Sequence, residues 1–130
     1  MPNTILVATA GGAADETAEY VARIAAALMA KLVVLHVADF EDDDAARELL
    51  ERFAEQARKK HVEAITVKQH GEVIDAITTT ARRYDVAMIV MGASQGSVLS
   101  KWLSSRVFDA TSIPVVVIPH NWMQDENESD

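Results

Sequence analysis

Apolar residues in this chain form short continuous runs that are separated by longer segments of mixed polarity. The runs have the length of β-strands and predict five of them, at residues 4–9, 31–37, 63–68, 86–91 and 114–118. Between the runs, apolar residues recur every three or four positions, which predicts helices. Before the second run, this helical stripe consists of Ala18, Val21, Ala25 and Leu28. The second run is apolar at nearly every position, which is typical of a parallel strand covered by helices on both faces.

The alternation of strand and helix predicts the fold class. It indicates a single α/β domain with a doubly wound, parallel sheet of five strands and helices on both faces. We expect the strand order 3-2-1-4-5, with a ligand crevice where the first and fourth strands diverge. The loops at this crevice are residues 9–12 and 92–97, and both contain glycine. Six residues of the central strands should be almost fully buried: Ile5, Val7, Val33, Leu35, Ile89 and Val90.

The loop after the fourth strand is the main candidate for a binding site. Gly92 ends the strand, and Gly96 and Ser97 come directly before the next helical segment. Backbone N–H groups at a helix start bind phosphate, and glycine permits close approach of the backbone. These residues therefore predict a site for a nucleotide phosphate. The same sequence also fits an ordinary strand-to-helix turn in which Ser94 or Ser97 caps the helix.

Two other groups of residues suggest alternative functions. Ser94, His36 and Asp39 have the side chains of a hydrolytic triad, and residues 92–96, GASQG, have the G-x-S-x-G spacing of α/β hydrolases. Because histidines without a catalytic role are common in α/β folds, we expect His36 to be a strand-end histidine with a structural hydrogen bond. The acidic residues between positions 39 and 44 have the oxygen ligands of a divalent-cation site. They lack the spacing of an EF-hand loop and are better explained as a solvated helix start.

The composition limits the class of protein. Of the 130 residues 49% are hydrophobic, and no apolar run is long enough to span a membrane. There is no cysteine, which excludes disulfides, cysteine-bound metal and thiol catalysis. The chain enters a strand pattern directly after Met1 and Pro2, without the basic region of a signal peptide. We therefore expect a cytoplasmic protein.

The net charge of −8 is concentrated in two places. Nine of the 20 acidic residues lie in clusters at residues 39–44 and 125–130, and the rest of the chain has 11 acidic and 12 basic residues. Because the sequence has no basic stripe that would neutralise phosphates, we do not expect nucleic acid as a partner.

Segments along nearly the whole chain resemble, in their order and spacing, the universal stress protein family. They are ILVAT from Ile5, LVVLHV from Leu32, HGEVIDAI from His70, DVAMIVMGAS from Asp85 and SIPVVVIP from Ser112. The resemblance implies a family domain over residues 1–120 and an acidic tail at residues 121–130. It also implies a Rossmann-like fold of the adenine nucleotide alpha hydrolase-like type.

The family contains a group that binds ATP and a group, resembling universal stress protein A, that is not thought to bind it. The ATP-binding pattern is G-x2-G-x9-G-[S/T] after the fourth strand, with an Asp after the first strand. Here Gly92 fits the first glycine, Gln95 stands at the second glycine position, and no glycine follows Gly96. Ala10 replaces the Asp. The resemblance therefore implies the non-ATP-binding A-type group, with a degenerate ATP-binding motif.

Some positions nevertheless match the binding pattern. Val37, at the end of the second strand, matches the valine whose backbone contacts adenine in the binders. If a nucleotide or phosphate binds, the residues that we expect to contact it are Thr9, Val37, Gly92, Gly96 and Ser97.

These observations support three functional interpretations. The first is a small homodimeric module in stress response or signalling, which is not an enzyme and needs no cofactor or metal. The second is a member of the family that binds ATP or AMP, with or without Mg²⁺, and acts as a nucleotide-dependent switch. The third is a small hydrolase or phosphate-handling enzyme. The sequence does not identify any other protein partner.

The fifth strand is the expected dimer interface. It consists of Val115, Val116, Val117 and Ile118, which are uncharged and apolar on both faces. In the order 3-2-1-4-5 this strand lies at an edge of the sheet, where unpaired backbone groups favour pairing with another strand. Members of the resembled family commonly dimerise through it.

Overall fold

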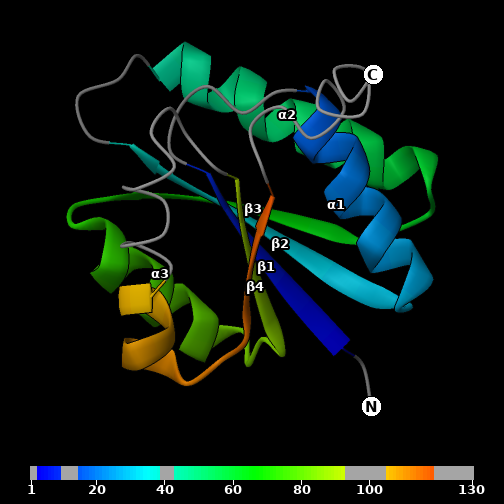
Figure 1. Cartoon of the computed structure of the whole chain (residues 1–130). Helices are drawn as coiled ribbons and strands as arrows, with labels where there is room; N and C mark the ends of the chain where they lie inside the picture. The colour runs from blue at the N-terminus through cyan, green and yellow to red at the C-terminus, as the bar shows by residue number, and fades with distance from the viewer. Residues whose placement is uncertain (1–2, 10–14, 39–42, 93–104, 119–130) are drawn as a thin grey trace, which may run out of the picture.

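The computed structural model describes residues 3–9, 15–38, 43–92 and 105–118, in which strands and helices alternate (Figure 1). The strands are β1 (Asn3–Thr9), β2 (Ala30–Ala38), β3 (Ala64–His70), β4 (Met88–Gly92) and β5 (Val115–Ile118). The helices are α1 (Asp15–Ala27), α2 (Asp43–Lys59) and α3 (Val73–Arg83). Residues 105–111 form a further helical segment before β5.

The five strands form one sheet in the order β3-β2-β1-β4-β5, and each of its pairings is parallel. Figure 1 shows α1 and α2 on one face of this sheet and α3 with residues 105–111 on the other. Parallel neighbours require crossover connections, and the helices between the strands supply them. The structure thus confirms the predicted fold class, strand order and helical layers.

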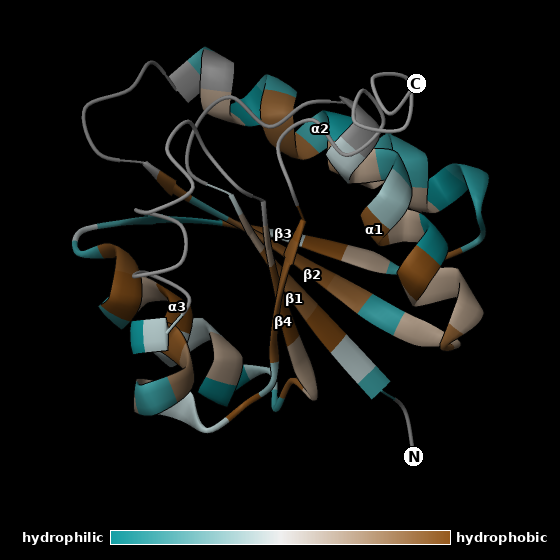
Figure 2. Cartoon of the chain, in the orientation of Figure 1, coloured by the Kyte–Doolittle hydropathy of each residue, from teal (hydrophilic) through white to brown (hydrophobic). Residues whose placement is uncertain are grey.

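Alternate residues of the strands contribute to two hydrophobic cores, one on each face. On β1, Ile5 and Val7 pack in the core that α1 and α2 cover, whereas Leu6 and Ala8 pack in the core that α3 covers. The six residues predicted to be buried are each at most 1% exposed. Figure 2 shows the apolar residues gathered on the strands and on the helix surfaces that face them. Because both faces are covered, the strands need apolar residues at successive positions.

The fourth strand begins at Met88, two residues later than predicted. The N–H group of Val86 donates to the carbonyl oxygen of Ala81 at 3.1 Å, and Asp85 has a left-handed backbone with φ of 51°. This hydrogen bond closes the end of α3. Val86 is therefore buried as part of a helix cap and not as part of the sheet ladder.

The apolar stripe of α1 ends earlier than its periodicity indicates. The helix ends at Ala27, and Leu28, the last position of the predicted stripe, lies in the following turn with 45% of its surface exposed. Met29 comes next, is 90% exposed and has a φ of 53°. The N–H group of Leu28 still donates to the carbonyl oxygen of Ile24 at 3.0 Å, so Leu28 follows the helical spacing, but its side chain is only partly covered.

Met29→Gly should stabilise the protein by about 0.5 kcal/mol. The left-handed conformation costs a residue with a Cβ atom about 1–2 kcal/mol, and glycine removes this cost. The gain is reduced by about 0.4–1 kcal/mol, because glycine increases the entropy of the unfolded chain. Little burial is lost, since Met29 is 90% exposed. Urea denaturation of the two proteins measures the difference.

Asp85→Gly is the matched control for this substitution. Asp85 has nearly the same φ, 51°, but aspartate tolerates the left-handed region better than methionine. A gain at Asp85 as large as that at Met29, or a loss at Met29, would contradict the explanation by backbone strain.

Candidate functional site

The strand order brings together the two strand ends that were predicted to flank a ligand. The register pairs Ala8 with Met91, so Thr9 and Gly92, the last residues of β1 and β4, end side by side. The helix that follows β1 lies on one face of the sheet, and residues 105–111, which precede β5, lie on the other (Figure 1). The connections of the chain therefore change from one face of the sheet to the other between β1 and β4. In open parallel sheets, ligands bind at the carboxyl ends of the strands at the place where this change occurs. We call this place the β1/β4 switch point.

Three of the five residues expected to contact a nucleotide lie in the described part of the chain. Thr9 ends β1 and is 6% exposed, Gly92 ends β4, and Val37 lies near the end of β2 and is 5% exposed. Val37 packs in the core on the α3 face. Gly96 and Ser97 lie outside the described residues. The structure therefore places the strand ends of the expected site but does not test its phosphate-binding loop.

A buried hydrogen-bonded pair links β1 and β2 next to the switch point. The Oγ1 atom of Thr9 lies 3.0 Å from Nδ1 of His36, and the two residues are direct neighbours in the sheet register. The Thr9 hydroxyl also donates to the carbonyl oxygen of Leu35 at 3.3 Å. His36 has no exposed surface. The expectation of a strand-end histidine with a structural hydrogen bond is confirmed.

Sequence reasoning did not assign Thr9 as the partner of this histidine. The two residues are 27 positions apart, and only the pairing of β1 with β2 makes them neighbours. The sequence did contain a signal for this pair, because each of the two residues is polar and stands near the end of an apolar run. In the order 3-2-1-4-5, these two runs are adjacent.

Of the three residues of the suggested hydrolytic triad, only His36 lies in the described part of the chain. Ser94 and Asp39 lie outside the described residues, so the distances of the triad are not tested. His36 is fully buried, and its Nδ1 atom is engaged with Thr9.

The amino terminus of α3 is capped by a carboxylate of the chain itself. Glu72 precedes the helix, and its two carboxylate oxygens accept from the N–H groups of Ile74 at 3.2 Å and Asp75 at 2.9 Å. Free N–H groups at a helix start are what binds an anion. At α3 the Glu72 carboxylate already occupies two of them.

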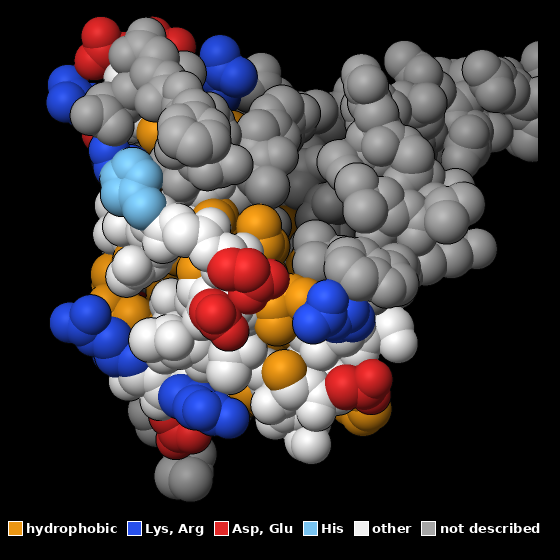
Figure 3. Space-filling model, turned by 90° about the vertical axis from the view of Figure 1, so that its left-hand side faces the viewer, with side chains coloured by type: hydrophobic (Ala, Val, Ile, Leu, Met, Phe, Trp, Pro, Cys, Tyr) orange, Lys and Arg blue, Asp and Glu red, His pale blue; other side chains and the backbone are white. Residues whose placement is uncertain are grey.

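Charged side chains of both signs lie on the face of the molecule shown in Figure 3. On the described part of the face in Figure 3, acidic, basic and apolar side chains are interspersed. Within residues 3–9, 15–38, 43–92 and 105–118, no group of three histidine or acidic side chains is arranged to hold a metal ion. Over the same residues, no helix has the length and apolarity needed to cross a membrane.

Comparison with known sequences identifies relatives of this chain. Residues 1–119 match the profile of the universal stress protein family. A universal stress protein of Helicobacter pylori is 30% identical over 79 residues, which is 58% of this chain and 56% of that protein. The match thus spans little more than half the length of this relative.

Comparison with solved structures supports the same fold. A universal stress protein crystallised in complex with cAMP has a TM-score of 0.74 and 16% identity, over 92% of this chain and 98% of that one. The universal stress protein from Archaeoglobus fulgidus in complex with dAMP has a TM-score of 0.71 and 21% identity, over 89% and 97% of the two chains. At these identities the likeness concerns the fold.

Proposed function

This chain belongs to the universal stress protein family, and we propose that it acts as a small homodimeric stress-response or signalling module with a degenerate nucleotide site. In this proposal the protein is cytoplasmic, belongs to the A-type group and is not an enzyme. The main support is the departure of the chain from the ATP-binding pattern of the family after its first and fourth strands.

Acidic residues accumulate where the helices begin, at the carboxyl ends of the strands. α1 begins at Asp15, α2 begins at Asp43, and Glu72 with Asp75 marks the start of α3. The side chain of Asp44, in the first turn of α2, is 78% exposed. Of these, the Glu72 carboxylate accepts hydrogen bonds from α3, and the Asp44 carboxylate lies 3.9 Å from the guanidinium of Arg47. Acidic residues suit the amino ends of helices and weakly disfavour an approaching polyphosphate.

The broken motif acts in the same direction as this charge. A triphosphate needs several converging N–H donors, and glycine allows the backbone to approach it. Gln95 stands where the family pattern has its second glycine, and no glycine follows Gly96. Ala10 removes the carboxylate that follows the first strand in ATP-binding members. Together these features support weak or absent ATP binding.

A nucleotide-dependent switch is the second candidate function. Thr9 and Gly92 end neighbouring strands and Val37 lies next to the end of β2, and in this candidate function Gly96 with Ser97 would supply phosphate contacts. Two proteins with this fold were crystallised with cAMP and with dAMP. A mononucleotide carries less charge than ATP, so the acidic edge disfavours it less.

A hydrolase or phosphate-handling enzyme is the third interpretation. It would need an accessible base, whereas His36 is completely buried beside Thr9. No other arrangement in the described residues favours it, so we propose a binding or signalling role without catalysis.

Millimolar ATP, with or without Mg²⁺, should raise the melting temperature of the protein by less than about 1 °C. A site with a dissociation constant of about 1 μM would instead add about 4 kcal/mol of stability at this concentration. For a domain of this size, that corresponds to a rise on the order of 10 °C. Differential scanning fluorimetry with ATP, AMP and cAMP measures the shift.

Mg²⁺ alone is the control for metal effects in this titration, and inorganic phosphate is the control for simple anion effects. A large shift with ATP would overturn the degenerate-site proposal. A large shift with AMP or cAMP alone would favour the second candidate function. Mass spectrometry of the freshly isolated protein provides an independent test, since the proposal expects no co-purified nucleotide.

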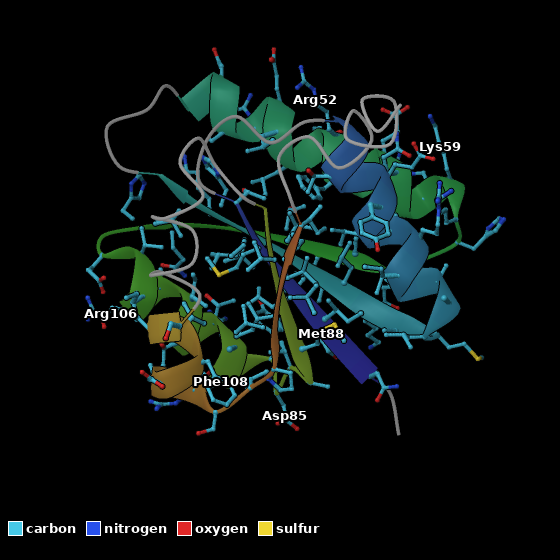
Figure 4. The ribbon with its side chains drawn as sticks, in the orientation of Figure 1. Arg52, Lys59, Asp85, Met88, Arg106 and Phe108 are labelled. Atoms are coloured by element: carbon cyan, nitrogen blue, oxygen red, sulfur yellow. The ribbon has the colours of Figure 1, made fainter. Side chains whose placement is uncertain are left out.

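The homodimer in this proposal uses the free edge of β5. Among the described strands β5 pairs only with β4, so its other backbone edge has no strand beside it. Val116 on this strand is 37% exposed. Phe108, which Figure 4 labels on the helical segment before β5, is 49% exposed. Antiparallel pairing of two β5 strands about a twofold axis would satisfy this edge and cover Val116.

A further inference from the structure

The contacts of Thr9 with Leu35 and His36 are satisfied together by one arrangement of protons. A threonine hydroxyl has a single proton, and a carbonyl oxygen can only accept. Thr9 Oγ1 lies 3.3 Å from the carbonyl oxygen of Leu35 and 3.0 Å from Nδ1 of His36, whose role depends on the tautomer of the ring. Both contacts are hydrogen bonds only if the hydroxyl donates to Leu35 and Nδ1 donates to the hydroxyl. This arrangement requires a proton on Nδ1 of the imidazole.

The position of this pair connects two strand ends in the region where the site is expected. Thr9 is the last residue of β1, which also pairs with β4, and His36 is its register partner on β2. By the alternation of side chains, both lie on the face where Ile5, Val7 and Val34 form the core under α1 and α2. Both side chains are buried, at 6% and 0% exposure, so water does not compete for the bond.

A buried hydrogen bond between two strands restricts how far one strand can shift relative to the other. Apolar side chains at these positions would also hold β1 against β2, but they would tolerate small shifts of one strand end. A hydrogen bond that requires one proton arrangement tolerates them less, because a misplaced donor in the core remains unsatisfied. The end of β1 is also the point from which the chain enters the expected ligand loop.

We propose that His36 is a positioning residue of the β1/β4 switch point. Its Nδ1–H group donates to Thr9 and holds the carboxyl end of β1 in the place from which the chain meets an adenine mononucleotide. For its ligand, this inference rests on the second candidate function. The proton arrangement and the order of the strand end are tested without any ligand.

Two matched pairs of variants separate positioning from simple packing. In His36→Asn the side-chain nitrogen is attached at the same carbon position as Nδ1 and can replace the donor. In His36→Gln the nitrogen corresponds to Nε2 and cannot. Likewise Thr9→Ser keeps the hydroxyl, whereas Thr9→Val has the shape of threonine without it.

The first measurement is nitrogen-15 NMR of the histidine side chain in the full-length protein. We expect His36 to carry a proton on Nδ1 in the wild type and to lose this preference in Thr9→Val. Detection of the neutral tautomer with its proton on Nε2 in the wild type would overturn the inference, because Nδ1 could not then donate to Thr9.

The second measurement is amide hydrogen exchange, residue by residue, in all five proteins. In His36→Gln and Thr9→Val, exchange at Ala8 and Thr9 should be at least tenfold faster, while exchange at Leu6 stays within threefold of the wild type. His36→Asn and Thr9→Ser should remain close to the wild type at all three amides. Equal acceleration at Leu6, or no difference between the Asn and Gln variants, would mean that the pair is only part of the core.

The third measurement is calorimetric titration with AMP. If the wild type binds AMP, its dissociation constant should rise at least tenfold in His36→Gln and less than threefold in His36→Asn; the Thr9 variants are left out because Thr9 is itself an expected contact of the nucleotide. Binding that is equal in these three proteins would overturn the positioning role and leave the second candidate function intact. If the wild type does not bind AMP, that candidate function fails, and the NMR and exchange results decide the inference alone.

Discussion

Replacing Val116 and Val117 together by lysine should convert a dimeric protein to monomers and raise the dimer dissociation constant at least about 100-fold. The two side chains lie on opposite faces of β5, so the charges would meet the partner on both faces of the joined sheet. In a twofold antiparallel pair centred on these residues, a lysine of one strand faces a lysine of the other, and like charges facing each other across strands are destabilising. Lysine on an edge strand is also a natural way to prevent pairing.

The measurement is light scattering over a concentration range around tens of micromolar, which detects dimers with dissociation constants of about 1 μM. Ile65→Lys with Thr66→Lys is the matched control, because β3 is the opposite edge of the sheet and Ile65 is 36% exposed, close to the 37% of Val116. The control pair should leave the mass unchanged. A wild type that is monomeric at tens of micromolar, or a control pair that dissociates the dimer, would refute the β5 interface.

Phe53→Ala should lower the free energy of unfolding by about 3–5 kcal/mol. Phe53 is the largest of the fully buried side chains and is 1% exposed. It joins α2 to the core that also contains Ile5, Val21 and Val34. Its removal leaves a cavity between the helical layer and the sheet, in a domain whose total stability is on the order of 5–15 kcal/mol.

Leu28→Ala is the control for this prediction and should cost less than about 0.5 kcal/mol, because Leu28 is 45% exposed. Urea denaturation at one fixed protein concentration measures both changes, since dimerisation makes stability depend on concentration. A cost below about 1 kcal/mol at Phe53, or a similar cost at the two positions, would contradict the described core.

The core was predictable because its signal lies in the local pattern of the sequence. A strand covered on both faces must be apolar at successive positions, and the run from Leu32 to Leu35 has this property. Short runs separated by helical periodicity allow few topologies, since crossovers between parallel strands are right-handed. The burial of Ile89 and Val90 followed from the first rule, and the second left few strand orders, among which the expected 3-2-1-4-5 is the one observed.

Element ends were less predictable, because capping depends on hydrogen bonds that periodicity does not report. Leu28 continues the spacing of its helix, yet the chain turns directly after it, at Met29, which is in the left-handed region. Val86 continues an apolar run, yet its N–H group bonds to the end of α3. In both cases a hydrophobic residue fits the periodicity of a helix or strand, but the hydrogen bonds of the helix-to-strand turn determine where that element begins or ends.

Some features of the candidate site were likewise determined by the sequence, and others only by the tertiary structure. The sequence by itself determined which residues depart from the family's ATP-binding pattern, since Ala10 and Gln95 are read directly from the chain. Only the tertiary structure decided that Thr9 and His36 share a buried hydrogen bond, because they are 27 positions apart and meet through the register of β1 with β2. Periodicity reports which face a side chain occupies, whereas a hydrogen bond depends on distances of a few ångströms that only packed strands define.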